Sequence, residues 1–317
     1  MNWSPSATQK VRKLRAGMLQ DIRAFFFEQD VLEVDTPALS KAGNTDPYIQ
    51  SFRFDNSLSS RYLHTSPEYS MKRLLAAGSG DIYQICKVWR EGESGNNHNP
   101  EFTLLEWYRV GFSYQQLMQE VASLLLQLLP SLKKDSQICS YEQLFLEKFK
   151  INPHIASKET LANCVSENIN GLSADSLDKQ AMLDALLTHC IEPDFDKSCL
   201  TFVFDYPASQ SALAQIREQA DYSVAERFEV YIGSIELGNG YQEEVDYQRN
   251  KLILHSENLM RKKCNLETVT EDFLFLEASR KGIPRSAGVA IGLDRVLMCI
   301  SGEKSIQKVI NFPWDQA

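Results

Sequence analysis

The sequence lacks the marks of a secreted, membrane-embedded or nucleic-acid-coating protein. Its seven cysteines are scattered, odd in number and without a C-x-x-C pair, which argues against a disulfide framework or a zinc site. Residues 1–17 lack the apolar segment of a signal peptide, and the longest apolar run, at 121–130, is too short to span a bilayer. A net charge of −9 argues against a broad basic surface for nucleic acid. We therefore expect a soluble cytoplasmic protein with no membrane anchor.

The residues that are present predict an α+β fold. A chain of 317 residues with 43% hydrophobic content can bury a substantial core. Apolar residues at three- and four-residue spacings predict a helix over residues 8–29. After a turn at 44–47, the stretch "LHTSPEYSMKRLLAAG" at 63–78 predicts a second, capped helix. There, Thr65 and Glu68 have capping-box spacing. Strands separated by helices, with hairpins among them, predict a mixed or antiparallel sheet flanked by helices.

Two further regions define the expected organisation. Residues 81–90 and 101–110 read as the strands of an antiparallel hairpin with a long polar loop. Secondary-structure signals are weak from residue 131 to residue 200. We expect several short helices there, which would form a helical insertion. We expect a single domain over residues 1–317.

The second strand of that hairpin carries unusual polar groups. Side chains alternate between the faces of a strand, so every second residue shares one face. The residues on that face are Phe102, Leu104, Glu106 and Tyr108. With Arg90 at the end of the neighbouring strand, such a set can bind a phosphate, stack a base and hold an ammonium group. The alternative is a solvent-facing strand with ordinary ion pairs.

The stretch "ERFEVYIGSIELGNGYQEE" spaces three glutamates by seven residues. Glu229, Glu236 and Glu243 would converge if turns or bulges form at the intervening glycines. Converging carboxylates suit Mg²⁺ or an organic cation, because they repel one another when unpaired. A charged hairpin surface is the alternative.

The stretch "GVAIGLDRVLM" predicts a strand, a tight turn and a helix. Small residues let the backbone approach a ligand, and Asp294 is predicted to cap the helix that carries Arg295 in its first turn. An arginine there opposes the helix dipole, so a partner such as a phosphate would favour it. The alternative is a plain strand-to-helix turn.

Four segments, in this order, resemble the class II aminoacyl-tRNA synthetase catalytic core, specifically its lysyl branch: "TSPEYSMKRLL", "HNPEFTLLEWY", "ERFEVYIGSIELGNGYQEE" and "AGVAIGLDRVLM". Lysyl-tRNA synthetases begin with an anticodon-binding domain, whereas this sequence starts at the catalytic domain. In that respect it is similar to paralogues of the branch that attach (R)-β-lysine to a lysine of elongation factor P. The resemblance implies a class II-like antiparallel sheet flanked by helices, and a homodimer formed through the region ending at Pro37.

The resemblance also implies an ATP site. Arg90 would be the catalytic residue, bridging the substrate carboxylate and the α-phosphate, while Phe102 and Arg295 would sandwich the adenine. The other implied nucleotide positions are Glu91, Gly92, His98, Asn99, Glu236, Leu237 and Gly292.

An amino-acid site and a metal site follow from the same resemblance. The implied amino-acid positions are Ser66, Pro67, Glu68, Glu106, Tyr108, Asn239, Glu243 and Ala290. Glu229 and Glu236 would hold Mg²⁺ on the phosphates.

Two positions depart from the lysyl pattern. Where that branch reads Arg-Asn-Glu, this chain has Arg90, Glu91 and Gly92, followed by Glu93. Whether Glu93 replaces the missing glutamate is left open. Ala290 stands where lysyl-tRNA synthetases have a glycine, and we expect its methyl group to favour β-lysine over α-lysine by about 1–3 kcal/mol.

The implied activity is ATP-dependent, AMP-forming ligation of a diamino acid to elongation factor P, with Mg²⁺ and without stable tRNA binding. Three alternatives stay open: a tRNA-charging enzyme without an anticodon domain, an asparagine synthetase on the same fold, and a non-catalytic regulatory module.

Overall fold

The computed structural model describes residues 3–55 and 60–317, and the chain forms two compact units. The first takes in Met1–Ser113 and Glu243–Ala317, and the second takes in Tyr114–Gln242. In the part of the chain described, no helix is both long and apolar enough to cross a membrane.

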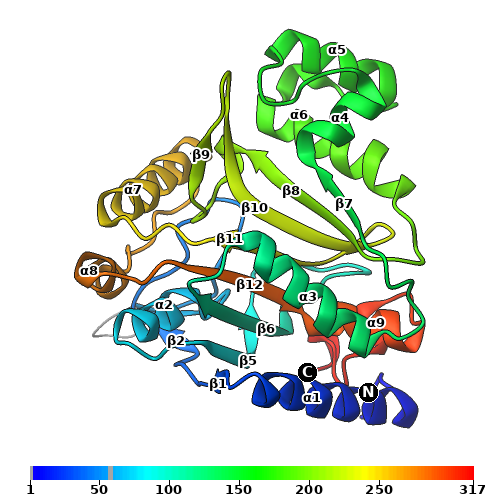
Figure 1. The fold of residues 1–317 in the computed structure, drawn as a ribbon, viewed down its shortest axis with the longest axis vertical. Helices are drawn as coiled ribbons and strands as arrows, with labels where there is room; N and C mark the ends of the chain where they lie inside the picture. The colour runs from blue at the N-terminus through cyan, green and yellow to red at the C-terminus, as the bar shows by residue number, and fades with distance from the viewer. Residues whose placement is uncertain (1–2, 56–59) are drawn as a thin grey trace. The chain divides into compact units, whose positions relative to one another are not determined.

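The first unit is built on strands β5 (Ile82–Trp89), β6 (Glu101–Val110) and β12 (Ser286–Gly292), which are antiparallel neighbours (Figure 1). The predicted hairpin is thus confirmed as β5 and β6. Strand β1 (Leu32–Glu33) runs parallel to β5, and a small separate sheet has the order β2 (Leu39–Ser40), β4 (Ser60–Leu63), β3 (Arg53–Asp55).

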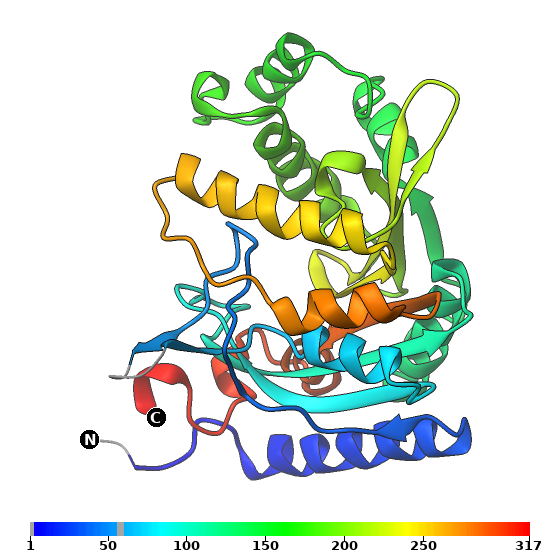
Figure 2. The ribbon, with the colours of Figure 1, turned by 90° about the vertical axis from the view of Figure 1, so that its left-hand side faces the viewer.

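Helix α1 (Gln9–Glu28) matches the helix predicted over residues 8–29 and covers one side of this sheet (Figure 2). Its Phe26 is fully buried and stacks on Tyr83 of β5, with 4.4 Å between the ring centroids. The chain ends meet beside α1, where the Ser6 amide donates to the Asn311 carbonyl at 2.8 Å. Aromatic packing of this kind holds α1 against the sheet.

Asp294 does not cap α9 (Leu293–Ser301), contrary to the prediction. The N-cap residue of this helix is Gly292, and no side chain caps it. The buried Asp294 carboxylate instead pairs with Arg15 of α1 and accepts a hydrogen bond from the Thr103 amide at 2.6 Å. It therefore ties α1, β6 and α9 together.

The predicted capping box of α2 (Glu68–Ala76) is also wrong. Pro67 is the N-cap residue, and Ser66 Oγ accepts from the Glu68 amide at 3.0 Å. The Thr65 hydroxyl accepts from the Asn44 side-chain amide at 2.9 Å, so it is engaged elsewhere. The Glu68 side chain is thereby left to another role.

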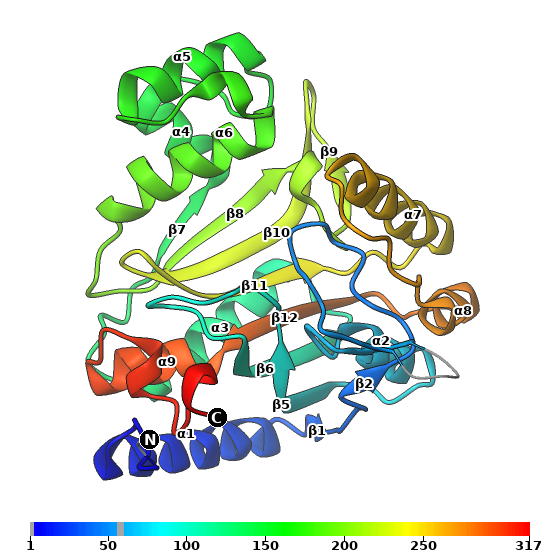
Figure 3. The same cartoon turned by 180° about the vertical axis from the view of Figure 1, so that it is seen from behind.

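Helices α7 (Tyr247–Lys263) and α8 (Phe273–Lys281) complete the first unit, and α2 and α8 lie side by side (Figure 3). Tyr69 of α2 stacks on Phe275 of α8 with 4.9 Å between centroids. Asp246 caps α7 by accepting from the Arg249 amide at 2.8 Å, as its position predicts.

The second unit combines strands with a helical layer. Strands β11 (Ile235–Gln242), β10 (Ser223–Ile232) and β8 (Thr201–Pro207) are antiparallel, β7 (Gln137–Ser140) is parallel to β8, and β9 (Ile216–Glu218) pairs with β10. Its helices are α3 (Tyr114–Leu128), α4 (Tyr141–Phe149), α5 (Lys158–Asn168) and α6 (Lys179–Leu186). Largely antiparallel strands flanked by helices confirm the α+β class.

Candidate functional site

The register of the first unit's sheet places the predicted polar residues on one face. Glu106 of β6 lies opposite Gln84 of β5 on one side and Ala290 of β12 on the other. Tyr108 lies opposite Ile82 and Gly288 in the same way. Because directly paired residues of antiparallel strands project to the same face, all of these line one surface.

Glu106 is buried within this surface and hydrogen-bonded at both oxygens. Tyr108 donates its hydroxyl to Oε1 at 2.6 Å, and Ser66 donates to Oε2 at 2.7 Å. Burial, followed by the charge of Glu68, raises the pKa of Glu106 to about 7. Burial and the Glu106 charge raise the pKa of Tyr108 well above its ordinary value, so its hydroxyl stays a donor.

A lysine that the sequence analysis did not single out sits between two of the predicted carboxylates. Lys72 Nζ lies 2.7 Å from Glu68 Oε1 and 2.5 Å from Glu243 Oε2. Its side chain is 0% exposed, which is exceptional for a lysine. Burial alone would lower the pKa of Lys72, but Glu243 and Glu68 outweigh it and raise that pKa, so Lys72 is a cation.

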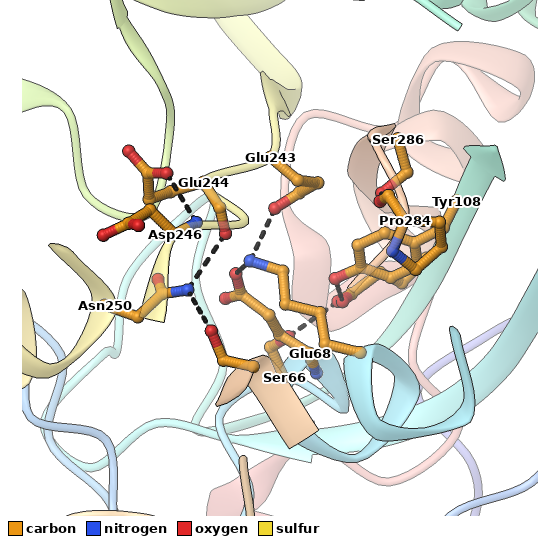
Figure 4. Close-up of polar contacts among 12 residues, drawn as sticks. Ser66, Glu68, Tyr108, Glu243, Glu244, Asp246, Asn250, Pro284 and Ser286 are labelled. Atoms are coloured by element: carbon orange, nitrogen blue, oxygen red, sulfur yellow. Dashed lines mark hydrogen bonds and ion pairs between the residues drawn. The ribbon is translucent and has the colours of Figure 1, made fainter. Parts of the chain in front are cut away.

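We call Glu68, Glu106, Glu243 and Lys72 the carboxylate cluster. Figure 4 shows Glu68, Glu243 and Tyr108 converging from α2, from the segment before α7 and from β6. Burial, partly offset by Lys72, raises the pKa of Glu243. When all four groups are ionised the cluster carries two negative charges in excess. It can therefore balance a small molecule with two ammonium groups.

Gly288 is a second residue that sequence analysis missed. A Cβ atom at this position would lie 2.3 Å from Glu243 Oε1 and 2.4 Å from Tyr108 Cε1. Only glycine lets those two side chains approach over β12.

The segment that carries Glu243 is held by its own contacts. The Glu243 amide donates to the Ser286 carbonyl at 3.0 Å. The buried Asn250 amide donates to the Glu244 carbonyl and to Ser279 Oγ, both at 3.0 Å (Figure 4). These bonds fix the backbone from which Glu243 projects.

The predicted nucleotide residues of the first unit gather beside the loop between β5 and β6. The Arg90 guanidinium lies 5.1 Å from the centroid of the Phe102 ring, and Arg90 Nη1 is 3.6 Å from Glu93 Oε1. Arg295 Nη2 is 2.8 Å from His98 Nε2, and Arg295 Nε donates to the Asn97 carbonyl at 3.2 Å. The Arg90 guanidinium beside the Phe102 ring suits a phosphorylated base, and Arg295 lies against the loop residues Asn97 and His98.

Other predicted positions in this loop have backbone roles. Asn99 is buried, with its amide donating to the Glu101 carbonyl at 2.6 Å and accepting from the Trp314 amide at 3.0 Å. The Glu91 amide donates to the Gln50 carbonyl at 2.9 Å. Gly92 has a φ of +83°, and nothing lies within 4 Å of where its Cβ would be. Outside this loop, Gly292 is half-buried, ends β12 and is the N-cap residue of α9.

The remaining predicted residues belong to the second unit. Glu229 accepts hydrogen bonds from Arg227 Nη2 at 2.5 Å, from the Tyr206 hydroxyl at 2.7 Å and from the Tyr231 hydroxyl. Asn239 accepts from Arg227 Nε at 3.1 Å. Leu237 is buried.

These contacts bear on the predicted Mg²⁺ site. Across residues 3–55 and 60–317, no group of three or more His, Cys, Asp or Glu side chains could hold a metal ion. An Mg²⁺ bound with ATP would take most of its ligands from phosphates and water and only one or two from carboxylates. Glu229 already accepts hydrogen bonds from three side chains, and it would have to give up some of these bonds to bind a metal ion.

Replacing Lys72 by methionine should lower the free energy of unfolding by about 3–5 kcal/mol, because Glu243 would be left buried without its cation. Urea denaturation at neutral pH measures the change. Lys148→Met is a matched control, since Lys148 pairs at 2.6 Å with Asp194 where both side chains are exposed. That control should cost about 0–1 kcal/mol. Equal small losses for the two variants would show that Lys72 is not holding the cluster.

The chain matches the family described as tRNA synthetases class II (D, K and N) over residues 1–316. Three similar proteins are called elongation factor P–(R)-β-lysine ligase. They come from Histophilus somni strain 2336 (41% identity, 99% of this chain and 98% of the relative), Haemophilus influenzae strain PittGG (41%, 100% and 98%) and Vibrio atlanticus (41%, 99% and 99%). By family match and by near-full-length similarity, this chain belongs to the class II tRNA synthetase family, as the resemblance predicts.

Proposed function

We propose that this protein activates (R)-β-lysine with ATP as an aminoacyl adenylate and transfers it to the ε-amino group of a lysine of elongation factor P. The observation that carries the proposal is the carboxylate cluster, whose two excess negative charges match the two ammonium groups of a diamino acid. Relatives similar over nearly their whole length are named for this ligation.

Activation needs positioning and charge more than a nucleophilic side chain. The carboxylate of the amino acid attacks the α-phosphorus of ATP, the adenylate forms, and pyrophosphate leaves. Arg90, beside Phe102, would bind the two reacting anions and offset the charge that develops between them. Bound Mg²⁺ would supply further positive charge at the phosphates.

Transfer forms an amide bond. The acceptor amine attacks the adenylate carbonyl, and AMP leaves with the electrons of the broken bond. A lysine with an ordinary pKa of about 10.4 is uncharged in only about one molecule in a few thousand at pH 7. The acceptor must therefore lose its proton to solvent or to the enzyme before it attacks.

An aspartate-specific activity is disfavoured by the same cluster. A substrate with a carboxylate side chain would add a negative charge beside three carboxylates, which costs free energy without a compensating cation. A diamino acid removes that repulsion.

We also propose that the protein acts in the cytoplasm as a homodimer formed through α1 and β1, and that it binds no tRNA stably. Phe27 of α1 and Leu32 of β1 are exposed apolar residues that a partner subunit would cover. If the protein sediments as a monomer at micromolar concentration, the proposed dimer is wrong.

The function is tested by ATP–pyrophosphate exchange with (R)-β-lysine, α-lysine and aspartate, followed by intact-mass measurement of elongation factor P and a tRNA-charging assay. We expect exchange to be fastest with β-lysine, a matching mass gain on elongation factor P, and no charged tRNA. Arg90→Ala should abolish exchange and serves as the negative control. Charging of tRNA without a mass gain would favour the truncated synthetase, and exchange with no amino acid would favour a regulatory module.

The pH dependence of amino-acid binding should report Glu106. Its folded-state pKa is raised to about 7, so it is protonated below that pH and ionised above it. The KM for the diamino acid should thus fall about tenfold between pH 6 and pH 8, since only the carboxylate balances an ammonium group. Glu106→Gln should raise this KM and remove the step, while the KM for ATP stays constant. A flat profile for the unsubstituted enzyme would disprove the assignment.

Ala290 should govern the choice between the two lysines. It lies directly opposite Glu106, so its methyl group is beside the carboxylate that we assign to an ammonium group. Ala290→Gly should raise kcat/KM for α-lysine relative to β-lysine by about 1 kcal/mol, roughly fivefold. Exchange kinetics with both amino acids measure the ratio, and an unchanged ratio would rule out this role.

A further inference from the structure

Gln84 lies on the same sheet face as Glu106 of the carboxylate cluster. It projects from β5 directly opposite Glu106, on the flank away from Ala290. The three side chains thus form one row across β5, β6 and β12. Opposite residues on neighbouring strands have Cβ atoms about 4.5–5.5 Å apart, so one ammonium group can contact both Gln84 and Glu106.

The amide oxygen of Gln84 has no hydrogen-bond partner among the residues that the structure describes, although the residue is only 3% exposed. Buried polar atoms are almost always paired in folded proteins, and a group that is not paired calls for a functional explanation.

The charges around Gln84 indicate which chemical group could donate a hydrogen bond to its Oε1. Glu106 is an acceptor, and its two oxygens receive hydroxyl donors that carry no charge. Lys72, the cation of the cluster, pairs with Glu68 and Glu243. An amide oxygen beside a carboxylate that lacks a cation of its own is complementary to a ligand cation with several N–H donors.

We propose that Gln84 is a substrate-binding residue whose Oε1 accepts a hydrogen bond from the ammonium group of the diamino acid that Glu106 balances. The inference rests on the proposed function and adds a recognition contact to it. Glu106 supplies the charge, and Gln84 supplies direction, because an amide oxygen accepts along defined lone pairs while the carboxylate attracts from any side.

The test is Gln84→Met, which keeps the length of the side chain but removes the acceptor. In ATP–pyrophosphate exchange its KM for (R)-β-lysine should rise about tenfold, whereas its KM for ATP should change less than twofold. Two analogues identify the amine: 6-aminohexanoic acid lacks the amine near the carboxylate, and 3-aminohexanoic acid lacks the terminal amine. Binding of the analogue without the contacted amine, measured by calorimetry, should be equal for the unsubstituted protein and the variant.

Thermal melting without ligand separates this role from a structural one. Gln84→Met removes an unpartnered acceptor, so its Tm should equal or exceed that of the unsubstituted protein. The matched control is Gln210→Met, because Gln210 is also buried but donates to Asp184 Oδ1 at 2.6 Å. Gln210→Met should lower Tm and leave the KM for β-lysine unchanged.

The inference fails if Gln84→Met lowers Tm as Gln210→Met does and leaves the KM for β-lysine unchanged, or if it weakens both analogues equally. Failure of the proposed function looks different, because the unsubstituted protein would then show no exchange with β-lysine.

Discussion

The buried ion pairs of Lys72 are the interaction on which the site depends. Two carboxylates as close as Glu68 and Glu243 would repel one another, and burial would drive at least one of them to take up a proton. A fully buried ammonium group within 2.7 Å of both makes their approach favourable. The sheet, α2 and the segment before α7 can therefore bring acidic side chains together without a bound ligand.

Different residues balance the charge of the carboxylate cluster and orient its carboxylates. Lys72 neutralises one negative charge, which leaves the other two for a substrate. Tyr108 and Ser66 orient the Glu106 carboxylate without neutralising it. A bound ammonium group would supply the missing charge, so binding the substrate should also complete the electrostatic balance of the fold.

The alternation of β6 and the four motif segments were enough to predict much of this site from sequence. A strand without a bulge has a strict period of two, so the common face of Phe102, Glu106 and Tyr108 follows from numbering alone. The glutamates of the cluster come from segments that are distant in the sequence. Without the structure, only the family resemblance predicts that they belong to one site.

The site residues that the sequence did not reveal owe their roles to tertiary burial. Lys72 looks like an ordinary helical lysine, and the only local sign of its role is its four-residue spacing from Glu68. Gln84 and Gly288 reveal themselves only through register. Asp294 and Thr65 look like helix caps, but their side chains pair instead with Arg15 and Asn44 from distant segments.

The backbone at Gly92 limits which residues this position of the nucleotide loop accepts. Its left-handed conformation would strain any other residue, although a Cβ atom there would meet nothing within 4 Å. A glutamate at position 92 would therefore need a different loop conformation as well as a different residue. The strain falls on the loop in which Glu93 already faces Arg90, so a larger residue at position 92 would disturb that pair as well.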